Sequence, residues 1–172
     1  MARRIMGKGF GIMAVDMFLK VEGADGESQD EAHAGEIDLL AYSFGAANTG
    51  TAHLGGGAGG GKVSVQDLSV TKYIDKASPN LLLFCANGKH IAECVLVVRK
   101  AGESPVDYVK MTMKDCLITS VQMSGAQGQE RLTENVGINF AEFSYEYTPQ
   151  KADGSGDAAV TMGWNVAKNV KA

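Results

Sequence analysis

Side chains able to bind a metal ion or a nucleotide are few and widely separated in this sequence. The three histidines, His33, His53 and His90, have no i, i+4 partner, so no local spacing gathers the three or four ligands that zinc needs. Residues 56–62 match the spacing G-x-x-x-x-G-K, but Val63 follows where a phosphate-binding loop has Ser or Thr before a helix. We therefore expect no metal, no cofactor and no nucleotide site.

No arrangement of nucleophiles and acids typical of an enzyme is present either. The sequence lacks the G-x-S-x-G motif of serine hydrolases, and Glu142 and Glu146 alternate with aromatic residues as on the polar face of a strand. Cys85, Cys94 and Cys116 form no C-x-x-C pair and stand in apolar runs, which indicates buried free thiols. The sequence thus predicts no catalytic residues.

The composition excludes further classes of protein. The chain has 172 residues, of which 45% are hydrophobic and 21% charged, as in one globular domain. The net charge of −4 argues against nucleic-acid binding through a broad basic face. The longest purely apolar stretches, residues 81–86 and 95–98, are far shorter than the roughly 20 residues of a membrane helix, so we expect no membrane insertion.

The N-terminal segment superficially resembles an export signal. Arg3 and Arg4 precede a mostly apolar stretch, but Asp16 interrupts it and no small-residue cleavage site follows. Met13 offers an alternative start. We expect residues 1–12 to be an appendage outside the fold, residues 13–172 to form a single domain, and any export to occur without a cleaved N-terminal signal.

The dominant period of the apolar residues is two, which is typical of β-strands. We predict strands at Val15–Val21, 37–44, 62–72, 91–99, 106–114, 116–123, 136–147 and 160–166. The alternation changes phase near Gln66-Asp67 and near Phe140-Ala141, which predicts a β-bulge at each point. About eight strands that change phase midway favour an all-β domain, either a barrel or two packed sheets.

Three segments depart from simple alternation. A helix is predicted with Ser78 as the N-cap, Pro79 at the first helical position, an apolar body at Leu81–Ala86 and Asn87-Gly88 as its C-terminal stop. Residues 45–61 form a long glycine-rich loop with few side chains to pack. Residues 37–44 carry apolar groups on both faces, so a helix or a neighbouring subunit must supply a second cover.

Ordered blocks of sequence resemble the haemolysin-coregulated protein family (Hcp) of type VI secretion. The most specific block runs from Gly61-Lys62-Val63 through DLSVTKYIDK at 67–76 to Ser78-Pro79. The others are MAVDMF at 13–18 with GES at 26–28, Cys85 with GKH at 88–90 and VRKAG at 98–102, and LTENV at 132–136 with YTPQ at 147–150 and GWN at 163–165. The blocks span nearly everything from Met13 to Trp164.

This resemblance implies an antiparallel two-sheet β-barrel flanked by one α-helix. It also implies homo-hexameric rings that stack into a tube, which a contractile sheath expels and a spike protein with valine-glycine repeats caps. The ring lumen would carry and protect small effector proteins. The chain would be cytoplasmic before firing and secreted afterwards.

Five residues are candidates for contacts in such an assembly. Ser43 lies between Tyr42 and Phe44, so it points away from both rings and, if they face the core, toward the lumen and its cargo. In the glycine-rich loop we expect docking on a neighbouring subunit or ring by Thr49, Thr51, His53 and Leu54. A monomeric β-barrel carrier of a small ligand is the alternative and an enzyme a third reading; the mass in solution separates the ring from the carrier.

Overall fold

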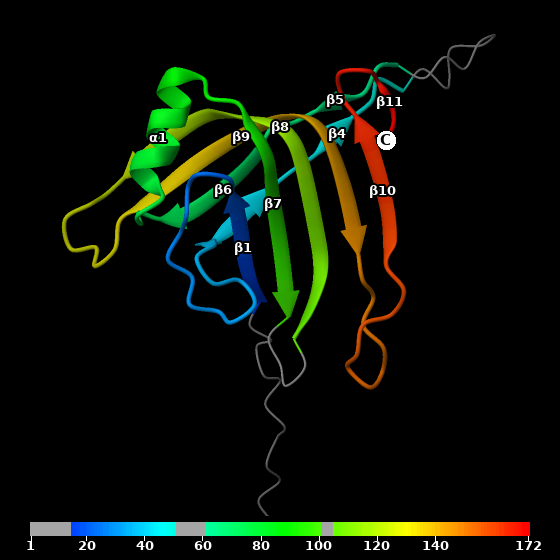
Figure 1. Cartoon of the computed structure of the whole chain (residues 1–172), viewed down its shortest axis with the longest axis horizontal. Helices are drawn as coiled ribbons and strands as arrows, with labels where there is room; N and C mark the ends of the chain where they lie inside the picture. Colours follow the sequence, from blue (N-terminus) through cyan, green and yellow to red (C-terminus); the bar gives the residue numbers. More distant parts are fainter. Residues whose placement is uncertain (1–14, 51–60, 101–104) are drawn as a thin grey trace, which may run out of the picture.

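The computed structural model describes residues 15–50, 61–100 and 105–172. It is mainly β, with antiparallel sheets and one helix, α1 (Ser78–Asn87) (Figure 1). The strands are β1 (Val15–Val21), β2 (Ile37–Asp38), β3 (Ala41–Ser43), β4 (Ala46–Ala47), β5 (Ser64–Val65), β6 (Leu68–Tyr73), β7 (Ile91–Lys100), β8 (Val106–Ser124), β9 (Thr133–Tyr147), β10 (Val160–Asn165) and β11 (Val170–Lys171). The expected N-terminal appendage and most of the glycine-rich loop lie outside the described residues.

Two long strands belong to both halves of the fold. β8 has 19 residues and β9 has 15, and they pair along most of their length. The first half of β8 and the second half of β9 lie in a sheet of order β11-β10-β9-β8-β7-β1-β2, which we call the large sheet. Their other halves continue into the order β3-β6-β9-β8, which we call the small sheet. The sequence predicted β8 as two separate strands, whereas one strand spans both sheets.

The predicted mainly β fold of antiparallel sheets with one helix is confirmed, but the two sheets do not close into the predicted β-barrel. The chain passes from β2 to β3 through Leu40, whose N–H donates to the carbonyl of Thr71 at 2.8 Å. In this passage the side of the strand that faces the core changes. Before Leu40 the odd-numbered residues Ile37 and Leu39 are buried, whereas after it the even-numbered Tyr42, in β3, packs against the core. The segment therefore has apolar residues on both faces because it passes from the large sheet to the small sheet, and not because one strand is covered on both faces.

A transverse crease crosses the large sheet where the buried face of three strands changes together. The buried residues that flank it are three positions apart in each strand: Ile91 and Cys94, Met113 and Cys116, and Phe140 and Phe143. Asp115 lies at the crease and has a φ of 52°, in the left-handed region. This conformation turns the side chains that follow it toward the opposite face of the sheet. The predicted phase change at Phe140-Ala141 is therefore present, but the register holds there and no residue is inserted.

The observed irregularities lie elsewhere in the small sheet. The β8–β9 register shifts between Ile118 and Ser120, so that Thr119 is an additional residue opposite Gly137, as in a β-bulge. Near Gln66-Asp67, where a bulge was predicted, the strand is interrupted instead. β5 ends before this point and pairs with β4, and β6 begins after it and pairs with β3. The phase slip in the sequence thus marks an exchange of partner strands.

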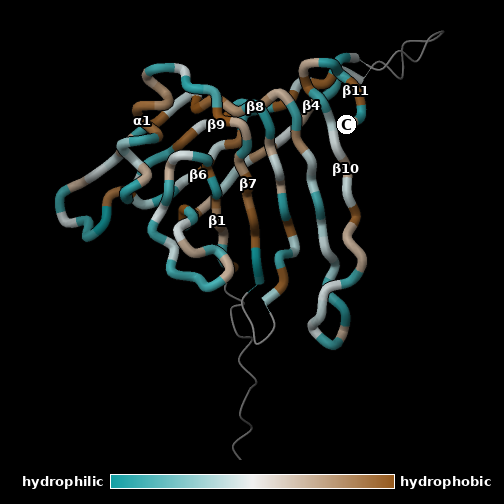
Figure 2. Tube along the Cα trace, in the orientation of Figure 1, coloured by the Kyte–Doolittle hydropathy of each residue, from teal (hydrophilic) through white to brown (hydrophobic). Residues whose placement is uncertain are grey.

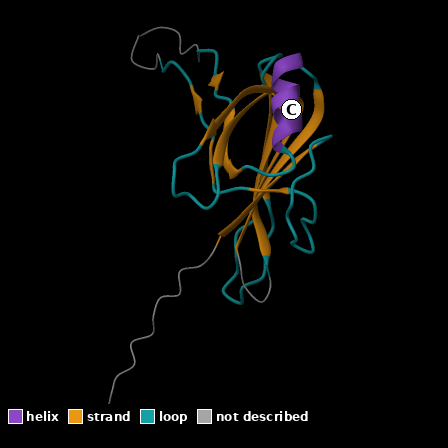
Figure 3. Cartoon of the chain, turned by 90° about the vertical axis from the view of Figure 1, so that its left-hand side faces the viewer, coloured by secondary structure: helices purple, strands orange, loops and turns teal. Residues whose placement is uncertain are grey.

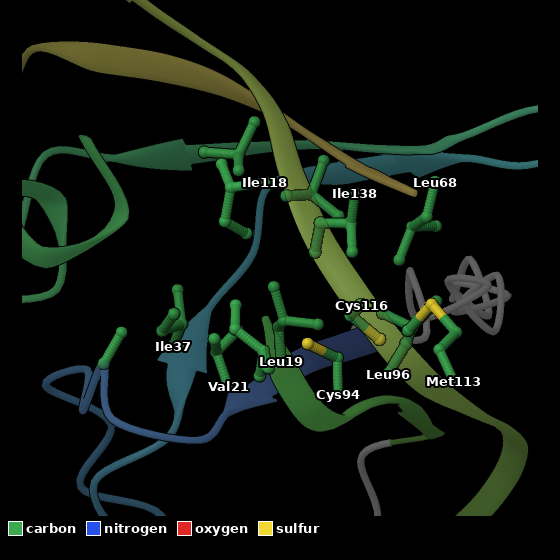
Figure 4. Close-up of a cluster of buried hydrophobic side chains, with 14 of the residues drawn as sticks. Leu19, Val21, Ile37, Leu68, Cys94, Leu96, Met113, Cys116, Ile118 and Ile138 are labelled. Carbon is green, nitrogen blue, oxygen red and sulfur yellow. The ribbon is translucent and has the colours of Figure 1, made fainter. Parts of the chain in front are cut away.

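The core lies between the two sheets and under α1 (Figure 4). Apolar residues concentrate in β7 and α1 along the chain (Figure 2). The three cysteines are free, with Cys94 and Cys116 buried and Cys85 half-buried. A hydrogen bond to the Cys116 sulfur and burial both raise the pKa of the Cys94 thiol, so Cys94 stays protonated and unreactive.

Helix α1 lies where a helix was predicted, but it begins one residue earlier, at Ser78. Ala77 is the N-cap, and no side chain caps the helix, because the Ser78 hydroxyl is hydrogen-bonded to Glu134 instead. Proline in the first turn is confirmed, and Gly88 ends the helix with a φ of 63° while its N–H bonds to the carbonyl of Phe84.

Candidate functional site

The outer surface of the small sheet is a continuous area of small polar residues, which we call the polar face. Alternation along each strand directs residues such as Tyr42, Val70 and Val136 to the core and their neighbours outward. The polar face consists of Ala41, Ser43, Ser69, Thr71, Ser120, Gln122, Asn135, Gly137 and Asn139. None of these residues is charged, which suits contact with many polar partners without strong attraction to one.

Ser43 lies in β3, the edge strand of the small sheet, and belongs to the polar face. It is exposed, pairs with Ser69 in β6, and lies in the row that continues through Gly137 to Ser120. Its orientation away from the buried side is the one expected from the sequence. Its contact with cargo stays a prediction.

Hydrogen bonds hold the polar face in a fixed arrangement. The Thr71 hydroxyl donates to the Asn135 side chain at 2.6 Å. At the bulge, Asp67 accepts from the Thr119 hydroxyl and from the Asn139 amide, both at 2.7 Å. A carboxylate that bridges two side chains in this way fixes the bulge, and it places one negative charge at the end of the polar face.

The residues predicted to dock on a neighbour are only partly described. Thr49 is exposed, whereas Thr51, His53 and Leu54 lie outside the described residues. The base of this loop is closed by Asn48, whose side-chain amide donates to the carbonyl of Gly61 at 2.8 Å. Below it, β4 and β5 form a separate two-stranded sheet that stands away from the body of the molecule (Figure 3).

The histidines are not brought together. His90 is exposed and His53 lies outside the described residues. His33 is buried, its ring stacks on Phe18 with centroids 4.3 Å apart, and its Nδ1 lies 2.9 Å from Glu36. Among residues 15–50, 61–100 and 105–172, no group of three His, Cys, Asp or Glu side chains could hold a metal ion.

On the outer face of the large sheet, Arg99 completes a cluster with His33. Its guanidinium lies 5.2 Å from the centroid of the Phe18 ring and forms an ion pair with Asp30. This ion pair lowers the pKa of Asp30 below its usual value. The cluster fastens the β1–β2 connection to the sheet.

A buried ionic network was missed by the sequence reasoning. Lys72 and Glu134 are both fully buried, and the Lys72 ammonium donates to Glu134 at 2.6 Å and to Asp75 at 2.7 Å. The Ser78 hydroxyl donates to the same Glu134 oxygen at 2.6 Å. A signal was present, because Lys72 follows Leu68 and Val70 in the core-facing phase of its strand.

No helix among the described residues is both long and apolar enough to cross a membrane.

Residues 18–147 match the family described as "Type VI secretion system effector, Hcp". Protein hcp1 of Pseudomonas aeruginosa is 53% identical over 162 residues, which cover 93% of this chain and all of that protein. The crystal structure of Hcp1 from Salmonella typhimurium has a TM-score of 0.77 at 38% identity, covering 93% of this chain and all of that one.

A second solved structure, described as that of a type six secretion system protein, has a TM-score of 0.88 at 29% identity. It matches 92% of this chain and its own full length. The agreement extends over nearly the whole chain in both sequence and fold. The chain therefore belongs to the Hcp family of the type VI secretion system.

Proposed function

We propose that this chain is a structural subunit of the type VI secretion tube, in which six copies form a ring and rings stack. The observation that carries the proposal is the small sheet, which combines an outer face of mostly neutral polar residues with unpaired edges. Among the described residues, β3 pairs only with β6, and β8 pairs only with β9 beyond Cys116. Pairing β3 of one copy with β8 of the next would join the small sheets into one wall.

In such a wall the polar face lines the lumen, where effector proteins travel. Hydroxyl and amide groups offer hydrogen bonds without a fixed charge, so cargo of varied charge can pass. The spike protein at the tube end, the sheath around it and the effectors inside it are the partners we infer. The chain acts without catalysis or cofactor, and it moves from the cytoplasm to the exterior on firing.

Light scattering and electron microscopy of the purified chain test the ring. We expect a mass about six times 18.1 kDa and particles with an open centre. A stable monomer over a wide concentration range contradicts the ring and favours the monomeric carrier of a small ligand.

The contact of Ser43 with cargo is tested by Ser43→Gln, which adds bulk to the lumen wall without a charge. We expect ring formation to be retained and effector recovery in a pull-down to fall. The matched control is Ser144→Gln, because Ser144 is also an exposed strand serine but belongs to the large sheet. Equal effector recovery in both variants removes Ser43 from the cargo contacts.

We further propose that Thr49, Thr51, His53 and Leu54 dock on a neighbouring subunit or the next ring. The isolated β4–β5 pair supports this, because a two-stranded sheet is marginally stable alone and gains from a partner. Deleting residues 49–58 should leave circular dichroism unchanged while weakening ring stacking and export. Normal tubes and export from the shortened chain would instead identify these residues as a linker.

A further inference from the structure

The outward side of α1 is apolar and uncovered. The ten residues of α1 include no charged side chain. Leu81 and Phe84 face the core, but Leu82 and Leu83 are 46% and 54% exposed. Two adjacent leucines on the solvent side of an uncharged helix form an exposed apolar patch. This exposed side, which we call the leucine ridge, lacks a cover in the isolated chain.

A groove of matching character lies on the open side between the sheets. It has a volume of about 400 Å³ and is lined by Tyr42, Phe44, Ala46, Phe143, Tyr145 and Met162. Phe44 and Phe143 meet edge to face with centroids 5.3 Å apart, and Met162 is 45% exposed at the rim. The pKa of Tyr42 is raised, mainly because the side chain is partly buried and to a smaller extent because Tyr145 and Tyr108 lie nearby. This agrees with limited contact between the Tyr42 hydroxyl and water.

The ridge and the groove are at opposite sides of the molecule. α1 packs on β8, whereas the groove lies between β3 and the β9–β10 pair, and Figure 1 shows α1 and β10 far apart. The ridge of a chain cannot reach its own groove. A contact between them must join different copies head to tail, which is the type of contact that closes rings.

The proposed ring brings these two surfaces together. If β8 of one copy lies beside β3 of the next, then α1, which packs on β8, comes next to the groove that β3 borders. The surfaces also match in charge: neither has a charged residue, although 21% of the chain is charged. Their burial therefore leaves no charge without water or a partner.

We propose that Leu82 and Leu83 of one copy insert into the groove of the adjacent copy, against Tyr42, Phe143 and Met162. This inference rests on the proposed ring and adds a second contact beside the pairing of sheet edges. The sheet edges supply hydrogen bonds and direction, and the leucines supply the apolar surface that makes an interface stable.

The direct test places a photo-reactive benzophenone amino acid at position 83 of the full chain. Illumination of purified rings should give a cross-linked dimer, and mass spectrometry should place the link in the peptides that carry Tyr42–Ala46 or Phe143–Met162. Cross-links from an intact ring to any other peptides overturn the inference while leaving the ring itself standing. If the purified chain is a monomer, both the ring and this contact fail.

A charge-exchange series gives an independent measurement. Leu83→Glu and Met162→Lys each place a charge in the contact, so each should lower the fraction of chain in rings by roughly tenfold or more, the scale of a central interface residue. Combining the two should restore most of the ring, because the new charges then pair. Val15→Glu is the control, since Val15 is 41% exposed at the far end of the large sheet. Rings from both single variants at wild-type yield contradict the contact.

Discussion

At the scale of single residues, the buried ion pair of Lys72 and Glu134 is the costliest arrangement in the fold. Removing two charges from water is expensive, and the attraction between them repays it only when further hydrogen bonds complete both groups. Here Asp75 and the carbonyl of Tyr73 complete the Lys72 ammonium, and Ser78 donates to Oε1 of Glu134. Oε2 of Glu134 is buried and has no hydrogen-bond partner among the described residues. The network therefore joins β6, the start of α1 and β9 at one point.

Replacing one partner should be far more harmful than replacing both. Lys72→Met leaves the Glu134 carboxylate buried without its cation, and we expect a loss of about 3–5 kcal/mol in the free energy of unfolding. The double variant Lys72→Met/Glu134→Leu should recover much of this loss. Urea denaturation measures both, with the exposed Lys110→Met as the control. A single variant as stable as the control would show that the pair is dispensable.

The ion pair of Asp30 and Arg99 predicts a dependence of stability on acidity. Since the pKa of Asp30 is lowered in the folded chain, its contribution is present above the ordinary aspartate value of about 3.9 and is lost as pH falls through the folded value. Asp30→Asn should therefore lower the melting temperature at pH 7 but not at strongly acidic pH. A difference that persists unchanged in acid would show that the effect does not come from the charge of Asp30, since asparagine keeps an oxygen that accepts from the N–H groups of Ala32 and His33.

At the scale of elements, the β1–β2 connection depends on a close approach of two backbones. A Cβ atom on Gly26 would lie 2.3 Å from the carbonyl oxygen of Glu36, so only glycine fits. Gly26 also donates its N–H to the carbonyl of Gly35 at 2.8 Å.

Gly26→Ala should destabilise the chain by about 1–3 kcal/mol, because the methyl group must push the connection off Ile37. Gly50→Ala is the matched control, since a Cβ there meets nothing within 4 Å. Thermal unfolding of both variants compares them. Equal melting temperatures would mean that the connection moves freely and is not fixed by this contact.

The elements differ in how well the sequence predicts them. The bounds of α1 follow from Pro79 and Gly88, because both act through local backbone geometry. Its N-cap could not be predicted, because the Ser78 hydroxyl bonds to Glu134, which is 56 residues away in the sequence. Phase changes were visible, but whether a bulge, a break or a left-handed residue such as Asp115 causes them depends on the partner strand.

Long-range partners likewise limited the prediction of the candidate site. The outward direction of Ser43 follows from its two aromatic neighbours, whereas the uncharged surface around it needs the register of four strands. The apolar groove combines residues from β3 and β10, which are far apart in the sequence, and no local pattern indicates that they meet.

At the scale of the whole molecule, the first strand of the described residues is β1, which pairs with β7 from Val15↔Lys100 to Val21↔Cys94. We propose that residues 1–12 lie outside the domain formed by residues 13–172. Deleting them should leave the melting temperature and the mass of the assembly unchanged. As a control, a chain that starts at Leu19 loses half of β1 and the buried Phe18, and it should unfold. A large loss of stability in the first deletion would extend the domain to the start of the chain.

The sharing of β8 and β9 between the two sheets has a mechanical consequence. In a sandwich of separate sheets, a load on one layer reaches the other through side chains that can slip. Here 19 and 15 residues of continuous backbone run through the crease from one layer to the other. A force along either strand is carried by covalent bonds and resisted in shear by a long ladder of hydrogen bonds, so the two layers should move as one stiff body under thrust.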